Sequence, residues 1–438
     1  MTNQELSPTS AVSKRLTPVA EKNRIESIDV LRGVAILGIL AMNIYAFTMP
    51  FSAYNNPLIW GGTDAFSKFI WFFTHIIFDQ KFLPIFSMLF GAGLILMFER
   101  SETGKFAGTW YRRTLWLLVI GALHGYLIWF GDILFTYAFL GLLIYPLRRK
   151  KAKTLIIFGS IWMLVALGLS SAGGFFMQKL GVEATKIETK VQAEEELSDK
   201  ETAMLQQWKG MRPMAAPTAE DLKKDIDAYL GSYADAVKHR APTVLMMQTM
   251  GLFFFGLWRM GGLMLIGMGL MKAGVFSAQK ETGFYRRLLI WCYGLGLPLV
   301  AVSAWQLAAH DWSFFFFQQA GVHWNYVGSV LVALGHVSLI MLAVKGKWFT
   351  KLEKRFAAVG RMAFTNYLMQ SIICTTIFYG YGLGLYGSID RPAQMLFVVA
   401  IWIIQLYYST WWLERFRYGP AEWFWRFLTY GKSIGFRK

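Results

Sequence analysis

The chain has 438 residues, of which 55% are hydrophobic and 17% aromatic, and its formal net charge is +17. This composition excludes an ordinary soluble domain, because several apolar runs approach or exceed the length of about 20 residues that a helix needs to cross a bilayer. Most basic residues lie in short loops between these runs, so membrane orientation accounts for the charge and no nucleic acid partner is expected. Cys292 and Cys374 lie inside apolar runs and predict neither a disulfide framework nor a metal site.

The N-terminus is predicted to be a disordered cytoplasmic tail over residues 1–23, followed by a first span over 28–47. This span contains Asp29, Arg32 and Asn43. Arg32 and Asn43 are separated by close to three whole helical turns, so they share one face about 16 Å apart along the axis. Ionisable residues inside a span usually face a bundle interior or a cavity. An Asp29–Arg32 pair at the headgroup level would instead be only a topology anchor.

The next apolar run is too long for one straight crossing. We predict a break near Asp79–Lys81, with an interfacial or re-entrant helix that holds His75 before it and a crossing over 82–98 after it. Further spans are predicted over 114–130, 133–147 and 154–176, and His124 should lie near the membrane midplane. Asp132 follows His124 across a tight outside turn, where it could orient the imidazole as carboxylates do for catalytic histidines.

Residues 177–242 differ from the N-terminal membrane region, 24–176, because they carry charges of both signs and few aromatic residues. We predict a small extracytoplasmic helical insertion, since long loops escape the positive-inside rule. The C-terminal membrane region, 243–413, contains predicted spans over 243–271, 288–309, 326–344, 362–379 and 394–413. The first of these is expected to be interrupted at Trp258-Arg259, and 310–324 is expected to be an outside aromatic loop.

Residues 414–438 are predicted to be a cytoplasmic tail with a short interfacial helix that begins at Pro420. The result is an all-α, polytopic integral membrane protein with about ten transmembrane helices and both termini cytoplasmic. Lys and Arg in the short loops agree with this orientation throughout.

Several costly polar residues fall at membrane depth and could line one cavity if their faces converge. The catalytic candidates are His124 first and His75 second, with Asp132 as the orienting carboxylate. The substrate-binding candidates are Arg32, Asn43, Arg259, His336, Asn366 and Gln370.

Each of these residues also has a structural explanation. A histidine in a span can bridge two helices by a hydrogen bond, and Asn366 with Gln370 can join helices in the same way. Arg259 beside Trp258 could be a cation–π or snorkelling arrangement, and His75 could be merely interfacial.

Three stretches of the sequence resemble the YeiB-like DUF418 family of bacterial inner-membrane proteins. They are RIESIDVLRGVAILGILAMNI, then KFLPIFSMLFGAGL with GALHGYLIWFGDILFTYAFLGLL, and finally GRMAFTNYLMQSIICTTIFYGYGLGLYG with FRYGPAEWFWRFLTYGK. The family is more distantly similar to integral-membrane acyltransferases of the acyltransferase-3 and heparan-α-glucosaminide N-acetyltransferase types. The acyltransferase-3 group places an Arg in span 1 and a His eleven positions later. Arg32 matches the Arg, but Asn43 stands at the His position, as in the heparan-type enzymes.

The resemblance implies a multi-pass acyltransferase of the bacterial inner membrane, surrounded by lipid and without a metal. Acyl-CoA or acetyl-CoA would be the donor, and a small molecule or glycan, such as a sugar, would be the acceptor. His124 or His75 would deprotonate the acceptor, and Arg32 and Arg259 would hold the CoA phosphates or stabilise the oxyanion. The rival interpretation is a transporter or a lipid- or isoprenoid-handling protein that uses the same cavity without catalysis.

Overall fold

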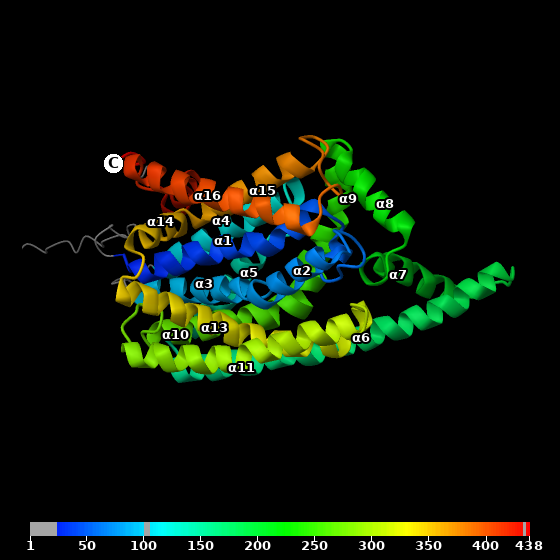
Figure 1. The fold of residues 1–438 in the computed structure, drawn as a ribbon, viewed down its shortest axis with the longest axis horizontal. Helices are drawn as coiled ribbons and strands as arrows, with labels where there is room; N and C mark the ends of the chain where they lie inside the picture. Colours follow the sequence, from blue (N-terminus) through cyan, green and yellow to red (C-terminus); the bar gives the residue numbers. More distant parts are fainter. Residues whose placement is uncertain (1–23, 100–105, 432–434) are drawn as a thin grey trace, which may run out of the picture.

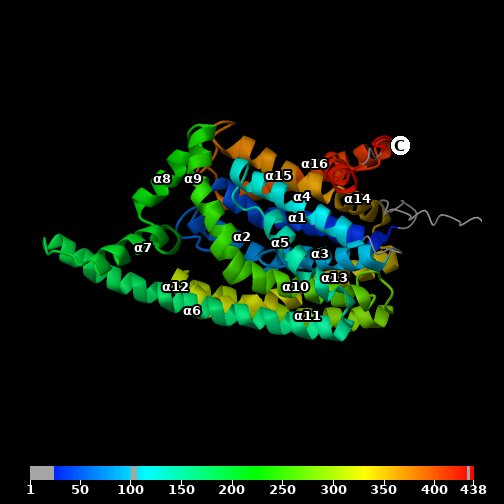
Figure 2. The ribbon, with the colours of Figure 1, turned by 180° about the vertical axis from the view of Figure 1, so that it is seen from behind.

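The computed structural model describes residues 24–99, 106–431 and 435–438, and its helices form one elongated bundle (Figures 1 and 2). The predicted tail, 1–23, lies outside the described residues. At the centre of the bundle is α1 (Glu26–Thr48), whose apolar window is 83% buried. Gly33 and Gly38 permit this burial, because an added Cβ would collide with the backbone of Phe356 and with the ring of Phe82. Two neighbouring helices, α14 (Thr350–Arg361) and α3 (Phe82–Glu99), therefore pack closely on α1.

Within the described residues, seven helical segments are long and apolar enough to cross a membrane. They are α1, the pair α2 (Ala65–Ile77) and α3, α6 (Ala152–Gln192), the segment Tyr233–Lys272, α11 (Thr282–Ala309), the segment Phe314–Gly346 and α16 (Arg391–Arg415). The three other predicted spans correspond to α4 (Phe106–Leu127), α5 (Leu134–Ile144) and α15 (Ala363–Phe378). These helices lie in the same bundle (Figure 1), so the protein is an all-α membrane protein, and the total of about ten spans stays a prediction.

The predicted break between α2 and α3 is confirmed, and the interfacial or re-entrant position of α2 stays a prediction. Asp64 caps the start of α2 by accepting hydrogen bonds from the Phe66 and Ser67 amides, and the helix ends at Ile77. Gln80 has a left-handed backbone, with φ 60°, which interrupts the helix before α3 begins. Together the two helices form one 35-residue candidate span that is broken along its length.

The helix predicted to end at residue 176, before the insertion 177–242, does not end there. Instead α6 continues past residue 176 to Gln192 and projects beyond the bundle (Figures 1 and 2). Leu180 and Ala184 on this projecting part pack with Trp208 of α7 (Asp199–Ala215). The following helices are α8 (Ala219–Leu230) and α9 (Tyr233–Met246), which return the chain to the bundle. The helices α7, α8 and α9 each begin with a capping box.

Two predicted irregular segments are helical in the structure. The expected interruption at Trp258-Arg259 is wrong, because the π-helical stretch η4 (Met247–Met260) joins α9 to α10 (Gly261–Lys272) without a break. A π-helix keeps its backbone hydrogen-bonded while it accommodates extra residues per turn. The expected loop over 310–324 is a short turn followed by α12 (Phe314–Phe316), η5 (Phe317–Gly321) and α13 (Val322–Gly346).

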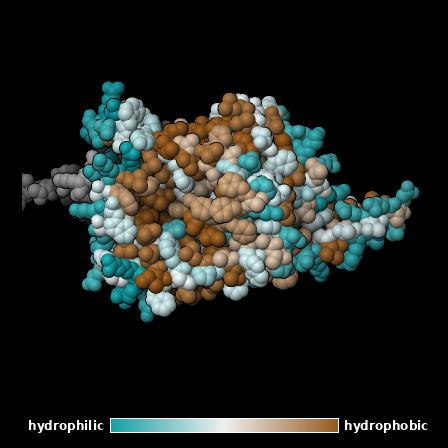
Figure 3. Space-filling view, in the orientation of Figure 1, coloured by the Kyte–Doolittle hydropathy of each residue, from teal (hydrophilic) through white to brown (hydrophobic). Residues whose placement is uncertain are grey.

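The surface has the pattern of a membrane protein. Figure 3 shows a broad hydrophobic belt around the middle of the visible face, with hydrophilic residues gathered at the two ends. Large apolar side chains such as Ile290, Trp291 and Trp305 of α11 are more than half exposed. The remaining elements are η2 (Phe51–Ala53), η3 (Tyr145–Arg149) and, after α16, the amphipathic helix α17 (Pro420–Tyr430).

Candidate functional site

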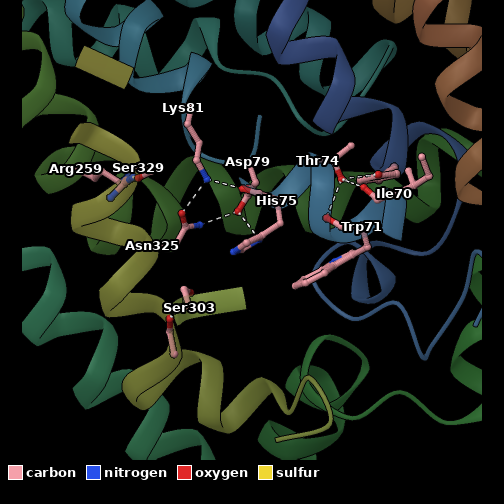
Figure 4. A network of polar contacts seen from close by, with 12 residues as sticks. Ile70, Trp71, Thr74, His75, Asp79, Lys81, Arg259, Ser303, Asn325 and Ser329 are labelled. Atoms are coloured by element: carbon pink, nitrogen blue, oxygen red, sulfur yellow. Dashed lines mark hydrogen bonds and ion pairs between the residues drawn. The ribbon is translucent and has the colours of Figure 1, made fainter. Parts of the chain in front are cut away.

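The break between α2 and α3 holds a network of buried polar side chains (Figure 4). His75 lies in the last turn of α2, and its Nδ1 is 3.2 Å from Oδ2 of Asp79. Asn325 of α13 donates from Nδ2 to the same carboxylate oxygen at 2.8 Å. Lys81 donates from Nζ to Asn325 Oδ1 at 3.0 Å and to the carbonyl oxygen of His75. We call these four residues, His75, Asp79, Lys81 and Asn325, the break site.

The break site is isolated from water, since none of its residues is more than 4% exposed. Burial of a carboxylate and an ammonium costs several kcal/mol per ion unless each group finds partners, and here Asn325 bridges Asp79 to Lys81. Among the described residues, His75 Nε2 and Asp79 Oδ1 still have no hydrogen-bond partner. Buried polar atoms are nearly always satisfied, so these two atoms are the candidates within the break site for contact with a water, a ligand or a reacting group.

Aromatic and cationic side chains surround the break site. The indole of Trp71 stacks on the imidazole of His75, with ring centroids 4.8 Å apart and planes 13° from parallel. Arg259 of η4 is 1% exposed and donates to the Tyr326 carbonyl at 3.2 Å and to Ser329 Oγ at 2.9 Å. Its guanidinium also stacks on the Tyr326 ring at 3.9 Å. Arg259 is therefore a second buried cation, and the residues that bind it lie on α13, the helix that also carries Asn325 (Figure 4).

His336, at mid-length of α13, has both ring nitrogens engaged. Its Nδ1 is 2.6 Å from the Tyr293 hydroxyl, and its Nε2 is 3.2 Å from the carbonyl oxygen of Ile77. The ring also packs beside Phe82 at the start of α3. His336 thus holds the two sides of the break, and it is not available as a base in this arrangement.

A second histidine–carboxylate pair lies where α4 turns into α5. His124 Nδ1 is 2.8 Å from Asp132 Oδ2, both side chains are buried, and the other carboxylate oxygen accepts the Phe135 amide at 2.8 Å. Among the described residues, His124 Nε2 has no partner, and the ring of Tyr367 lies 5.2 Å away. The predicted mid-span depth of His124 stays a prediction, and within α4, which begins at residue 106, His124 lies in the last turn.

The remaining predicted residues do not join either pair. Arg32 lies 3.1 Å from Asp29 near the start of α1, and Asn43 is partly exposed toward its other end. Asn366 donates to the Val359 carbonyl at 3.2 Å and to Ser409 Oγ at 3.0 Å.

Gln370, one turn after Asn366, also joins helices. It donates to the Ile36 carbonyl at 3.3 Å and to Gln405 Oε1 at 2.9 Å. Both amides therefore make the interhelical contacts that the sequence left open as their structural explanation. The predicted residues occupy several separate places in the described part of the bundle.

Sequence reasoning missed three residues of the break site as functional candidates. The four-residue spacing of His75 and Asp79 puts them on one helical face, which would have suggested the pair. Lys81 is a charged residue inside an apolar run, which is a further signal. Asn325 carries no such signal, because only the packing of α13 against the break brings it to Asp79.

Comparison of the sequence with known proteins shows the family to which the chain belongs. A family model described as a protein of unknown function, DUF418, matches residues 270–432. The chain is also 34% identical over 414 residues to the uncharacterized protein YeiB of Escherichia coli (strain K12), which covers 92% of this chain and 95% of YeiB. The chain belongs to the YeiB-like DUF418 family. The uncharacterized protein YxaH of Bacillus subtilis (strain 168) is 31% identical over 437 residues, 95% of this chain and 96% of YxaH.

The break site combines two parts of this DUF418 protein. Asn325 lies within the residues that the family model matches, whereas His75, Asp79 and Lys81 come before them in the chain.

Proposed function

We propose that the protein is a membrane-embedded acyltransferase that moves an acyl group from cytoplasmic acyl-CoA to an acceptor at the outer side of the membrane. The observation that carries the proposal is the buried His75–Asp79 pair, whose His75 Nε2 has no partner among the described residues. A histidine oriented by a carboxylate is suited to general-base catalysis.

In the proposed reaction, His75 Nε2 takes the proton of an acceptor hydroxyl or amine as that atom attacks the thioester carbon. A C–O or C–N bond forms, the C–S bond breaks, and the imidazolium returns the proton to the CoA thiolate. Asp79 keeps the Nδ1–H of His75 oriented throughout. Lys81 and Arg259 supply positive charge near the oxyanion of the tetrahedral intermediate, in a buried environment that strengthens the effect.

We place His75 ahead of His124 as the base because of what surrounds each ring. His75 has the buried ammonium of Lys81 in contact with its carbonyl oxygen and lies beside a break in a candidate span. His124 has Asp132 as its charged neighbour and lies in the last turn of α4. Arg32, paired with Asp29 at the predicted cytoplasmic end of α1, stays the candidate for the CoA phosphates.

Transport or lipid handling without catalysis is the second candidate. It is supported by the broken α2–α3 segment, because an unwound stretch between two half-helices, lined by charged side chains, is typical of transporter binding sites.

The test uses inverted membrane vesicles that contain the protein and [14C]acetyl-CoA supplied at the cytoplasmic face. Label should enter a lipid or glycan fraction, and His75→Gln should lower the rate by about 10²-fold or more, as loss of a general base does. His124→Gln is the matched control and should retain transfer. Absence of label above the level of empty vesicles would contradict the acyltransferase proposal and would favour transport or lipid handling without catalysis.

A further inference from the structure

At one end of the bundle, the C-terminal helix α17 packs against the first half of α4. The indole Nε1 of Trp425 donates to the Arg113 carbonyl at 2.8 Å, and Arg112 donates to the Thr429 carbonyl at 3.3 Å. Figures 1 and 2 show the C-terminal helix, in red, at the same end of the bundle as the start of α1, which is predicted to be cytoplasmic. We call this contact between α4 and α17 the seam.

Two arginines of the seam are held in place by aromatic rings. The guanidinium carbon of Arg113 lies 3.5 Å from the centroid of the Trp425 ring, and that of Arg426 lies 4.4 Å from the centroid of the Tyr418 ring. Both arginines are half-buried, and Arg113 lies within electrostatic range of Arg426 and of Tyr430. Because the rings already restrict both guanidiniums, a ligand that binds them costs less side-chain entropy.

Neither of these arginines has an acidic partner in an ion pair. Among the described residues, the guanidiniums of Arg113 and Arg426 form no ion pair and donate no hydrogen bond. Glu422 lies within electrostatic range of both, but its oxygens accept from the amides of Phe364 and Thr365 and from the Thr365 hydroxyl, at the start of α15. The carboxylate of Glu422 is therefore committed to capping α15.

The other cations nearby do not relieve this imbalance. Arg24 and Arg32 lie within electrostatic range of Arg426, and both already share the carboxylate of Asp29. An excess of positive charge therefore remains on Arg113 and Arg426. Like charges repel strongly where water is partly excluded, and a bound anion offsets that repulsion. Phosphate fits best, because a guanidinium binds its oxygens bidentately.

The surface beside the seam is apolar. On α17, Phe424 and Phe427 are 49% and 41% exposed. Exposed apolar side chains also follow Arg113 along α4, namely Leu115, Trp116, Val119 and Leu123. A phospholipid with its phosphate at the seam can lay its acyl chains along this face of α4, whereas a soluble phosphate compound gains nothing from it. The combination of unpaired arginines and an adjoining apolar face therefore selects a lipid.

We propose that the seam between α4 and α17 binds the phosphate of an anionic phospholipid in the predicted cytoplasmic leaflet. Arg113 and Arg426 contact the phosphate oxygens, and the Tyr430 hydroxyl donates to the headgroup. Basic clefts between membrane helices bind phospholipid headgroups in the same way in other membrane proteins. The seam shares no residue with the break site, so this lipid site goes beyond the proposed acyl transfer and does not depend on it.

The experiment measures lipid binding by native mass spectrometry of the full chain, delipidated in detergent. The probe is dioleoylphosphatidylglycerol, dioleoylphosphatidylcholine is the zwitterionic comparison, and inorganic diphosphate is the soluble phosphate. The variants are Arg113→Gln and Arg426→Gln. The matched control is Arg415→Gln, which removes one positive charge from the end of α16, where Arg415 pairs with Glu414. Thermal unfolding in detergent shows whether each variant is folded, and Arg426→Gln keeps the test valid if Arg113→Gln is not.

The first phosphatidylglycerol should bind about tenfold more tightly than phosphatidylcholine. Arg113→Gln and Arg426→Gln should each weaken its binding about tenfold, and Arg415→Gln should leave it unchanged. Equal affinities for the two lipids would overturn the proposal, as would an equal loss in all three variants, which would mean a general attraction of charge. Displacement of the lipid by inorganic diphosphate would assign the seam to a soluble phosphate compound and would also overturn it.

Discussion

His336 Nε2 lies 3.2 Å from the carbonyl oxygen of Ile77, the last residue of α2. This carbonyl belongs to the group of helix-end acceptors that have no partner within their own helix. The contact shows how the bundle tolerates a broken helix inside a candidate membrane span, because α13 supplies the donor that the break removes.

Replacement of His336 should therefore loosen the break. His336→Phe removes the partners of both the Ile77 carbonyl and the Tyr293 hydroxyl, and we expect a loss of about 2 kcal/mol or more in the free energy of unfolding. Reversible unfolding in mixed micelles would measure it. Tyr293→Phe removes only one of the two contacts and should cost less. An equal loss in the two variants would show that the Ile77 contact contributes nothing.

Lys81 and Asp79 should be coupled energetically. Lys81→Met leaves a buried carboxylate without its neighbouring ammonium, and we expect a cost of about 3–5 kcal/mol. The double variant with Asp79→Asn removes both charges and should recover much of that loss. The measurement is a double-mutant cycle on the free energy of unfolding. Strictly additive losses would mean that the two buried charges do not interact.

Arg240 of α9 should be essential for the junction between α4 and residues 177–242. Its guanidinium is fully buried and donates to the carbonyl oxygens of Tyr126, Leu127 and Ile128, which are at and just after the end of α4. Arg240→Leu leaves these acceptors unpaired and should cost at least about 2 kcal/mol, measured by thermal unfolding in detergent. Arg240→Lys should recover only part, because an ammonium lacks the planar fork of donors.

The control for Arg240 is Arg212, which forms a half-buried pair with Asp221 in the same region. Arg212→Leu should cost about 1 kcal/mol, less than Arg240→Leu, because it breaks one partly solvated ion pair and leaves no backbone acceptor unpaired. Similar losses for the two arginines would contradict the role of Arg240 as the cap of α4.

The start of α7 should loosen in acid. Hydrogen bonds from Lys190 and then from Ser198 lower the pKa of Glu201 from 4.5 to about 2. Because the folded-state pKa lies below the unfolded one, the stabilisation is fully present above about pH 4.5 and is lost as the pH falls toward about 2. Hydrogen exchange over residues 193–203, corrected for intrinsic rates, should rise in this window for the wild type. Glu201→Gln should exchange fast at every pH, and a protected variant would refute the effect.

Sequence reasoning was most successful where a local pattern is sufficient. Runs of apolar residues predicted the all-α membrane class, since only helices and closed barrels satisfy the backbone in lipid. The polar cluster after His75 predicted the break before α3, and the proline at 420 predicted the start of α17. It was less successful where tertiary packing decides the length or continuity of a helix. It placed the end of α6 too early, and it predicted an interruption where the π-helical segment is continuous.

By itself, the sequence determined the class of protein, the position of most helices and the presence of polar and ionisable residues within apolar runs. Only the tertiary structure decided which of those residues meet. Asn325 is 246 positions from Asp79, and no helical period connects them, so their hydrogen bond exists only because α13 packs against the break between α2 and α3. Helix packing also decided that the amides of Asn366 and Gln370 hydrogen-bond to a neighbouring helix. The Nε2 atom of His75, in contrast, is buried without a hydrogen-bond partner among the described residues.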